Sequence, residues 1–181
     1  VAGAGGGDVG PVGVFLSGGL EHSDGWTPVH EGAGAADVPL EFDAWNTNAR
    51  IQGVIGRTVV ALRAGLFEEK RSAGLVGANS EATGVTGSLT AAAAPEPGML
   101  GWRLQGWVRG SNLRNTSVAV APGRNTTTPA NNQYATPAAG WGFNAALRGT
   151  NDTFEWEAGA DLRRTHGETQ ELFRFMQGDF T

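Results

Sequence analysis

The sequence predicts an all-β fold, an antiparallel up-and-down meander of about seven to eight amphipathic strands. The first observation is a period-two pattern. In GWRLQGWVR, residues 101–109, every second residue is apolar or glycine, and the residues between carry arginine, glutamine and tryptophan. The second observation is composition, since 29 of the 181 residues are glycine and only 17% are charged, against roughly a quarter in typical domains. Abundant Gly, Thr, Val, Trp and Asn favour strands and turns over helices.

The same alternation marks each predicted strand in turn. The predicted strands cover about residues 12–21, 43–55, 59–68, 81–93, 101–110, 139–149 and 153–164. The glycine-rich residues 1–11 give no reliable periodicity, although 7–10 are a candidate turn after an earlier strand. Residues 172–175 are a candidate start of an eighth strand.

The predicted connections alternate between long and short. Long polar loops are expected at about 22–42, 69–80, 111–138 and 165–172, and short turns at 55–58, 94–98 and 149–152. Transmembrane β-barrels have this alternation, with long loops on the extracellular side. Large aromatic residues also stand near strand ends on the apolar face, as in a membrane-interface girdle; they are Trp45, Trp102, Trp141, Phe154 and Trp156. Periodicity alone favours a soluble sandwich or a propeller piece. The two further features, loop length and aromatic placement, favour a transmembrane barrel instead.

Composition excludes several classes of function. The chain has no cysteine, so it has no disulfide and no thiolate metal site. A net charge of -5 and the lack of a basic run interleaved with aromatics argue against nucleic acid as a partner. No apolar run reaches the 18 or so residues of a spanning helix. No signal peptide is visible and both ends fall in mid-pattern, so a fragment of a larger protein is expected.

No pattern predicts an enzyme. His22, His30 and His166 fall in predicted loops without metal-ligand spacing. Three acidic residues on residues 153–164 share one strand face, but arginines on the neighbouring strands are available as partners, so a charged wall is expected rather than an acid–base pair. Neither a phosphate loop nor a G-x-S-x-G nucleophile motif is present. No catalytic residue, metal or cofactor is predicted.

Several segments resemble the barrel of TonB-dependent outer-membrane receptors. They are SGGLEHSDGWTP (17–28), TTTPANNQYATPA (126–138), GADLRRTHGET (159–169) and the ending FRFMQGDFT (173–181). The resemblance implies a 22-stranded barrel with an N-terminal plug domain, which imports siderophores, cobalamin or carbohydrates with energy delivered by TonB. Residues 1–181 depart from the whole pattern, because they contain no plug, no TonB box and about a third of the strands. The resemblance therefore implies a partial barrel domain.

The resemblance also implies an orientation and a set of partners. The apolar faces would meet lipid of a bacterial outer membrane, and the polar faces would meet the plug, the lumen and a small nutrient ligand. The residues expected to face the lumen are Arg50, Arg63, Arg103, Arg109, Glu155, Glu157 and Asp161. The candidate ligand contacts in loops are Trp26, His30, Asn112, Arg114, Asn132, Gln133, Tyr134 and His166.

Two alternatives remain open at this point. A soluble or surface-anchored all-β binding module, such as an adhesin fragment, predicts that the apolar faces of 60–66 and 102–108 pack on each other or on a second sheet. The other alternative is a small, complete eight-stranded barrel.

Overall fold

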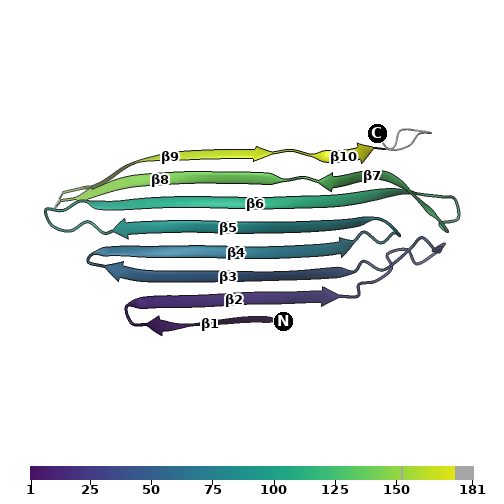
Figure 1. Ribbon diagram of the computed structural model, residues 1–181, viewed down its shortest axis with the longest axis horizontal. Coiled ribbons are helices and arrows are strands. Elements are labelled where there is room, and N and C mark those ends of the chain that lie inside the picture. Colours follow the sequence, from purple (N-terminus) through teal and green to yellow (C-terminus); the bar gives the residue numbers. More distant parts are fainter. Residues whose placement is uncertain (152, 174–181) are drawn as a thin grey trace.

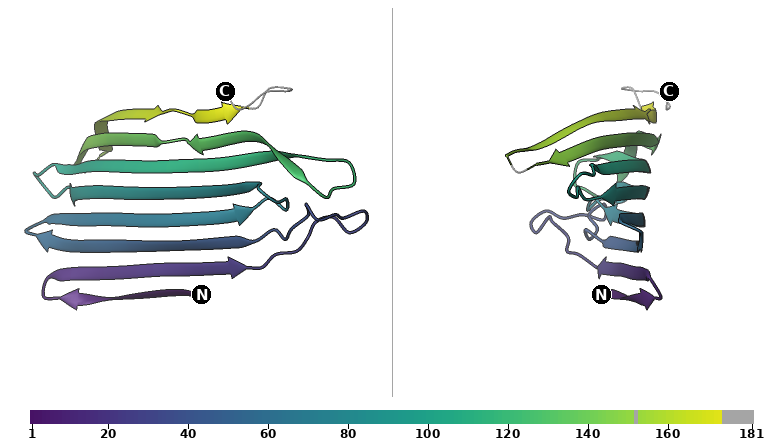
Figure 2. Two further views of the ribbon diagram at one scale, coloured as in Figure 1. Left: turned by 45° about the vertical axis from the view of Figure 1, so that its right-hand side comes forward. Right: turned by 90° about the vertical axis from the view of Figure 1, so that its left-hand side faces the viewer.

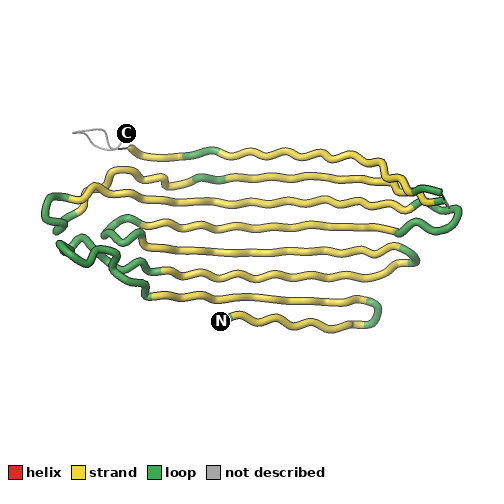
Figure 3. Tube along the Cα trace, turned by 180° about the vertical axis from the view of Figure 1, so that it is seen from behind, coloured by secondary structure: helices red, strands yellow, loops and turns green. Residues whose placement is uncertain are grey.

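The computed structural model describes residues 1–151 and 153–173, which form a single antiparallel sheet (Figure 1). Its ten strands are β1 (Ala2–Val9), β2 (Val12–Ser23), β3 (Phe42–Ile55), β4 (Thr58–Ser72), β5 (Asn79–Ala93), β6 (Gly101–Val120), β7 (Thr127–Ala135), β8 (Ala138–Thr150), β9 (Glu155–Gly167) and β10 (Gln170–Phe173). No described residue is helical (Figure 3), and no helix long and apolar enough to cross a membrane is found among these residues. The predicted all-β antiparallel class is confirmed.

The strands follow an up-and-down meander. β1 to β6 pair in sequence order, and β7 and β8 lie end to end along β6. β9 pairs with β8, and β10 with β7. The ten strands therefore make eight passes across the sheet. The predicted start of an eighth strand at 172–175 falls partly in β10, which prolongs β9; residues 174 and 175 lie outside the described residues.

Every predicted strand exists, but the predicted loops are wrong in extent. β4 continues to Ser72, β5 starts at Asn79, and β6 continues to Val120 before β7 returns along it. Large parts of 69–80, 111–138 and 165–172 are therefore strand. The reason is that polar side chains occur on both faces there, as in Ser111 and Asn112. The hydrogen-bond ladder continues, but the alternation that marks a strand in the sequence disappears.

The alternation of apolar and polar residues does not reveal β1. Its sequence AGAGGGDV offers almost no side chains that could alternate, yet each residue pairs with β2 from Ala2↔Gly19 to Val9↔Val12. The turn lies at Gly10 and Pro11, after the predicted 7–10, because Gly10 takes a φ of 62° that glycine adopts without strain.

The connections differ at the two ends of the sheet. The turn end carries 10–11, 56–57, 94–100 and the link from Thr150 to Glu155; the loop end carries 24–41, 73–78 and 121–126. The predicted strict alternation of length is wrong, because 94–100 is as long as the loop-end connections 73–78 and 121–126. What distinguishes the loop end is the segment 24–41 and strands that run on past their apolar residues.

The sheet is a single layer. Among the described residues, the only buried apolar ones are alanines, namely Ala36, Ala78, Ala93 and Ala146. Leu62 and Val108 are 50% and 60% exposed, so the packing of 60–66 against 102–108 that a sandwich requires is absent. The two segments instead lie on the same face of one sheet. The sheet is curved (Figure 2) but open, because β1 and β9 do not pair, so the eight-stranded closed barrel is absent from the described residues.

The register divides the sheet into two faces. Residues paired across strands point to the same side, so the row Val14–Ile51–Leu62–Leu89–Gly106–Phe143–Leu162 lies on one side. We call this side the apolar face and the other the polar face. The large apolar side chains form a continuous belt on the apolar face, and polar rows follow at the loop end.

The loop-end boundary of this belt is oblique to the strands. Toward the loop end, the last large apolar residue of the belt on each strand from β2 to β9 is Leu20, Trp45, Leu66, Val85, Val108, Trp141 and Leu162. On β6, Val118 and Val120 lie farther out and are separated from the belt by Asn112, Arg114 and Thr116. Each of these boundary residues lies in the same cross-strand row as one residue of β2. That β2 residue is Leu20 for β2 and β3, Gly18 for β4 and β5, Leu16 for β6 and β8, and Val14 for β9. The belt therefore shifts steadily toward the turn end across the sheet.

Candidate functional site

The charged residues expected to face a lumen all lie on the polar face. The register pairs Arg50 with Arg63, Arg109 with Thr86, and Asp161 with Asn144, all on this side. Arg103, Glu155 and Glu157 occupy the same face nearer the turn end, where Arg103 lies 3.7 Å from Glu157. Arg148 on the same face pairs with Glu155 at 2.6 Å. Whether this face lines a lumen remains a prediction.

The centre of the polar face carries three arginines without a carboxylate. Arg50, Arg63 and Arg109, which we call the arginine cluster, take part in none of the ion pairs found among the described residues. Arg50 donates a hydrogen bond to the amide oxygen of Gln52, and the Arg109 guanidinium lies 5.7 Å from the centre of the Trp107 ring. None of the three charges is therefore neutralised by an ion pair with a described carboxylate.

A hollow of about 360 Å³ opens over the arginine cluster. Phe15 stands at one end and Trp107 at the other, in the row Phe15–Arg50–Arg63–Ser88–Trp107. Asn48 and Thr86 add polar groups from the adjacent row. Two aromatic faces with cationic and hydroxyl donors between them are suited to a small ligand with negative charge.

A second hollow, of about 710 Å³, lies at the loop end. It brings together three of the candidate ligand contacts: Arg114, Asn132 and Tyr134. The row Lys70–Glu81–Arg114 continues the apolar face beyond the belt. Its charges are paired, with Lys70 2.6 Å from Glu68 and Arg114 3.8 Å from Glu81. Paired charges give this hollow little net attraction for an ion.

The other candidate contacts do not join this hollow. Trp26 and His30 are exposed in 24–41, and Gln133 pairs with Asn115 on the polar face. Asn112 accepts a 2.9 Å hydrogen bond from the Thr136 backbone N–H, and His166, on β9, lies opposite Ala139 of β8. The predicted loop contacts therefore do not form one site. Among the described residues, no group of acidic residues, histidines or cysteines could hold a metal ion.

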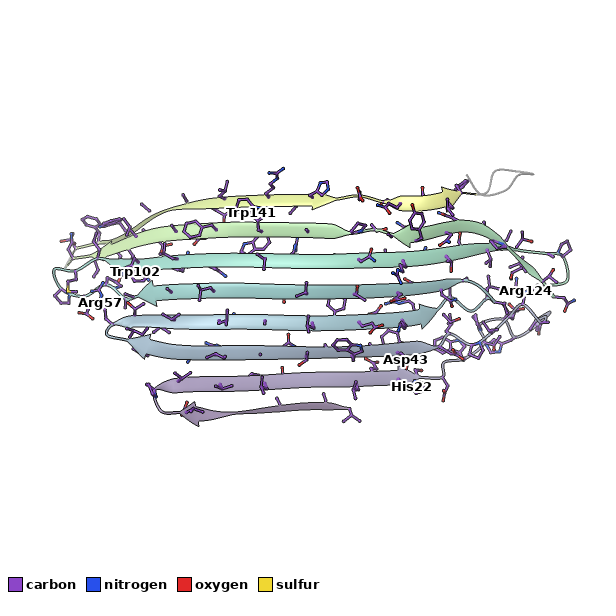
Figure 4. All side chains as sticks on the ribbon, in the orientation of Figure 1. His22, Asp43, Arg57, Trp102, Arg124 and Trp141 are labelled. Atoms are coloured by element: carbon purple, nitrogen blue, oxygen red, sulfur yellow. The ribbon has the colours of Figure 1, made fainter. Side chains whose placement is uncertain are left out.

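At the loop end, His22 and Asp43 lie side by side beyond the belt (Figure 4). His22 Nδ1 is 2.6 Å from the Asp43 carboxylate and His22 Nε2 is 3.1 Å from Asp24. The hydrogen bond with Asp43, followed by that with Asp24, raises the pKa of His22. This histidine therefore belongs to an exposed network of charged side chains.

The loops at this end are held together by one buried carboxylate. The Asp37 side chain is 1% exposed, and the Arg124 Nε donates to its two oxygens at 2.9 and 3.1 Å. Ala36 N–H donates to the Arg124 carbonyl at 2.8 Å, and Val76 N–H donates to the Ala36 carbonyl at 2.9 Å. The Asp37–Arg124 pair thus joins 24–41, 73–78 and 121–126 into one unit. The sequence does not predict this ion pair, because Asp37 and Arg124 are single residues 87 positions apart and form no local pattern.

We expect acid or Asp37→Asn to release these loops. The hydrogen bonds from Arg124, followed by that from the Gly34 backbone, lower the pKa of Asp37 from 3.8 to about 2. A depressed carboxyl pKa stabilises the folded loops above pH 3.8, and that stabilisation is lost as the pH falls through about 2. Hydrogen exchange, corrected for intrinsic rates, should show protection of the Ala36 and Val76 amides at pH 5 that falls by about tenfold or more at pH 2.

In Asp37→Asn the same protection should already be weak at pH 5. Asp24→Asn is the control, since the Asp24 carboxylate is exposed in the same loop and touches only His22 among the ion pairs described. Equal protection of the Ala36 and Val76 amides in the two variants would contradict the role of Asp37 in holding the three loops together.

No protein-family model, curated protein or solved structure matches the chain.

Proposed function

We propose that the chain is part of the wall of an outer-membrane β-barrel of the TonB-dependent receptor type, which takes up a small nutrient. The apolar belt would face lipid, and the polar face would face the barrel interior. The TonB-dependent type is drawn from the sequence resemblance alone. The oblique apolar belt is the observation that carries the membrane assignment.

The slope of the belt supports a spanning sheet. Its boundary moves from Leu20 to the row of Val14, six residues, over the six strand steps from β2 to β9. At about 3.3 Å per residue and about 4.8 Å per strand, this is a slope of about 35°. Strands of transmembrane barrels tilt by about 35–45°, so a belt in the membrane plane crosses them obliquely by this amount. In a soluble sandwich, the apolar boundary is not expected to shift steadily in one direction from strand to strand.

The width of the belt fits the same orientation. On β3 it runs from Trp45 to Ile55, ten steps of about 3.3 Å, or about 33 Å along the strand. At a tilt of about 40° this spans about 25 Å along the membrane normal, the height of the apolar band in known barrels. Trp45 at its edge donates a 2.8 Å hydrogen bond to Glu68, as expected for an indole with its ring in lipid and its N–H in the polar interface.

The open edges of the sheet support a larger barrel. β1 and β9 each carry an edge without a strand partner among the described residues. In hydrocarbon, unpaired backbone groups cost several kcal/mol each, so spanning sheets close into barrels. Further strands would therefore complete this wall.

Lipid contact can be tested with single-tryptophan variants. Trp141 lies on the apolar face and Trp107 on the polar face, in rows next to each other. Of the six tryptophans, all but one are replaced by phenylalanine, and each variant is placed in vesicles whose lipids carry bromine on the upper acyl chain. We expect strong quenching of Trp141 and little of Trp107, since bromine quenches only on contact.

A soluble sandwich would leave both tryptophans unquenched, and the membrane proposal would then fail. The receptor type has its own test in the flanking coding DNA. A plug domain upstream and further alternating strands downstream would support it, whereas stop codons near both ends would contradict it.

A further inference from the structure

The arginine cluster has an arrangement that is unfavourable without a ligand. Arg50 and Arg63 are a direct cross-strand pair, and like charges directly opposite each other destabilise a sheet. The two rows that contain Arg50, Arg63 and Arg109 carry no carboxylate on any strand from β1 to β9. The nearest acidic residues on this face toward the turn end, Asp8 and Asp161, lie at opposite edges of the sheet. Neighbouring strands therefore leave this charge uncompensated.

The cluster also has the size and lining of a ligand site. Its hollow of about 360 Å³ is within the range of small-molecule pockets, about 300–1,000 Å³. Phe15 and Trp107 are four strand steps apart in one row, or about 19 Å. A guanidinium presents a planar fork of donors that matches carboxylate and phosphate oxygens.

We propose that the arginine cluster binds a small oxyanion with two or more negative charges, through Arg50, Arg63 and Arg109, with Trp107 as a stacking surface. The proposal deepens the proposed function and rests on it in one respect: if the polar face lines a barrel, a multivalent anion is the class of nutrient that this face would bind on its way through. Binding itself requires only the folded sheet.

The test is binding by the full chain in detergent micelles. The probes are benzene-1,3,5-tricarboxylate, which offers both charge and an aromatic plane, and pyrophosphate, which offers charge alone. Glucose at the same concentration is the neutral control. Binding is followed by Trp107 emission in the variant that keeps only this tryptophan, and by calorimetry. We expect both anions to bind, and binding to weaken steeply with salt, since the site is exposed.

Arg63→Gln is the informative variant. It should weaken both anions by about tenfold or more, because it removes charged hydrogen bonds. It should also leave thermal stability unchanged or raised, since it removes the like-charge pair with Arg50. A merely structural arginine would lower stability instead. Arg164→Gln is the matched control, because Arg164 is exposed, lies opposite Trp141 on the apolar face and should not affect binding.

Several results would overturn the proposal. They are anions binding no better than glucose, Arg164→Gln weakening binding as much as Arg63→Gln, and an acidic glutamate peptide binding far more tightly than either small anion. The last would identify a polypeptide segment as the occupant. Failure of anion binding with Trp141 still quenched by lipid would refute this inference and leave the membrane proposal intact. Anion binding without quenching of Trp141 by lipid would support this inference and refute the membrane proposal.

Discussion

Leu89→Arg should reduce the ratio of folded to unfolded protein in vesicles by about 30- to 1,000-fold, if the apolar face meets lipid as we propose. Leu89 lies on the apolar face halfway along the belt on β5, between Val85 and Ala93, and the residue is 52% exposed. Arginine on the lipid face of a barrel costs about 2–4 kcal/mol at the bilayer midplane and much less near the interfaces. The loss arises from the transfer of the charge into hydrocarbon. Unfolding by urea in vesicles measures it.

The matched control is Thr90→Arg. Thr90 is the next residue on the same strand, and the register places it on the polar face opposite Ala61 and Gln105. An arginine there would join a face that already carries Arg50, Arg63 and Arg103, so we expect a change in unfolding free energy within about 1 kcal/mol. Equal losses in the two variants would contradict the assignment of the apolar face to lipid, since backbone effects of a substitution on β5 would then dominate.

The same two-faced pattern explains which parts of the fold the sequence predicts. Between Trp102 and Val108 apolar and polar residues alternate, so strand, faces and boundaries near the turn end all follow from periodicity. From Ser111 to Val120 the same strand has polar residues on both sides, so a loop was predicted where β6 continues. Pairing through the backbone needs no side-chain pattern, and this part of the fold was therefore beyond a periodicity argument.

The candidate site was predicted only in part for a related reason. Alternation places Arg50, Arg63 and Arg109 on polar sides of three strands, but only register determines that they meet around one hollow with Phe15. Register depends on turn geometry and on the match between neighbouring strands. The sequence predicts the loop candidates from polarity alone, and polarity does not distinguish Arg114 in the loop-end hollow from His30 in an exposed loop.

Glycine also has a packing role that the sequence does not reveal. The Trp107 ring covers Gly142, its direct cross-strand partner. Phe67 covers Gly84 and Trp156 covers Gly149 in the same way. A Cβ added at Gly142 would lie 2.4–2.6 Å from three atoms of the Trp107 ring. The glycine is needed because the ring occupies the space above it. Aromatic cover of a glycine also protects strand backbone that has no side chain of its own.

Gly142→Ala should therefore destabilise the sheet by about 1–3 kcal/mol, because the indole must leave its position or the strands must separate. Gly106→Ala is the matched control. Gly106 is paired with Phe143 on the apolar face, and an added Cβ there meets no heavy atom within 4 Å. Since glycine in a strand interior is about 0.5–1 kcal/mol less favourable than alanine, Gly106→Ala should be neutral or stabilising. Unfolding by urea in detergent compares the two.

A double-mutant cycle then separates the clash from the backbone effect. In a Trp107→Ala background the space above Gly142 is empty, so Gly142→Ala should lose most of its cost, and the coupling between the two positions should be about 1–3 kcal/mol. Gly142→Ala should also weaken anion binding at the arginine cluster, because Trp107 forms one wall of that hollow. An undiminished cost of Gly142→Ala without Trp107 would mean that the glycine serves backbone conformation rather than the indole. In that case the tryptophan would be free to move, and the hollow would have one rigid wall fewer.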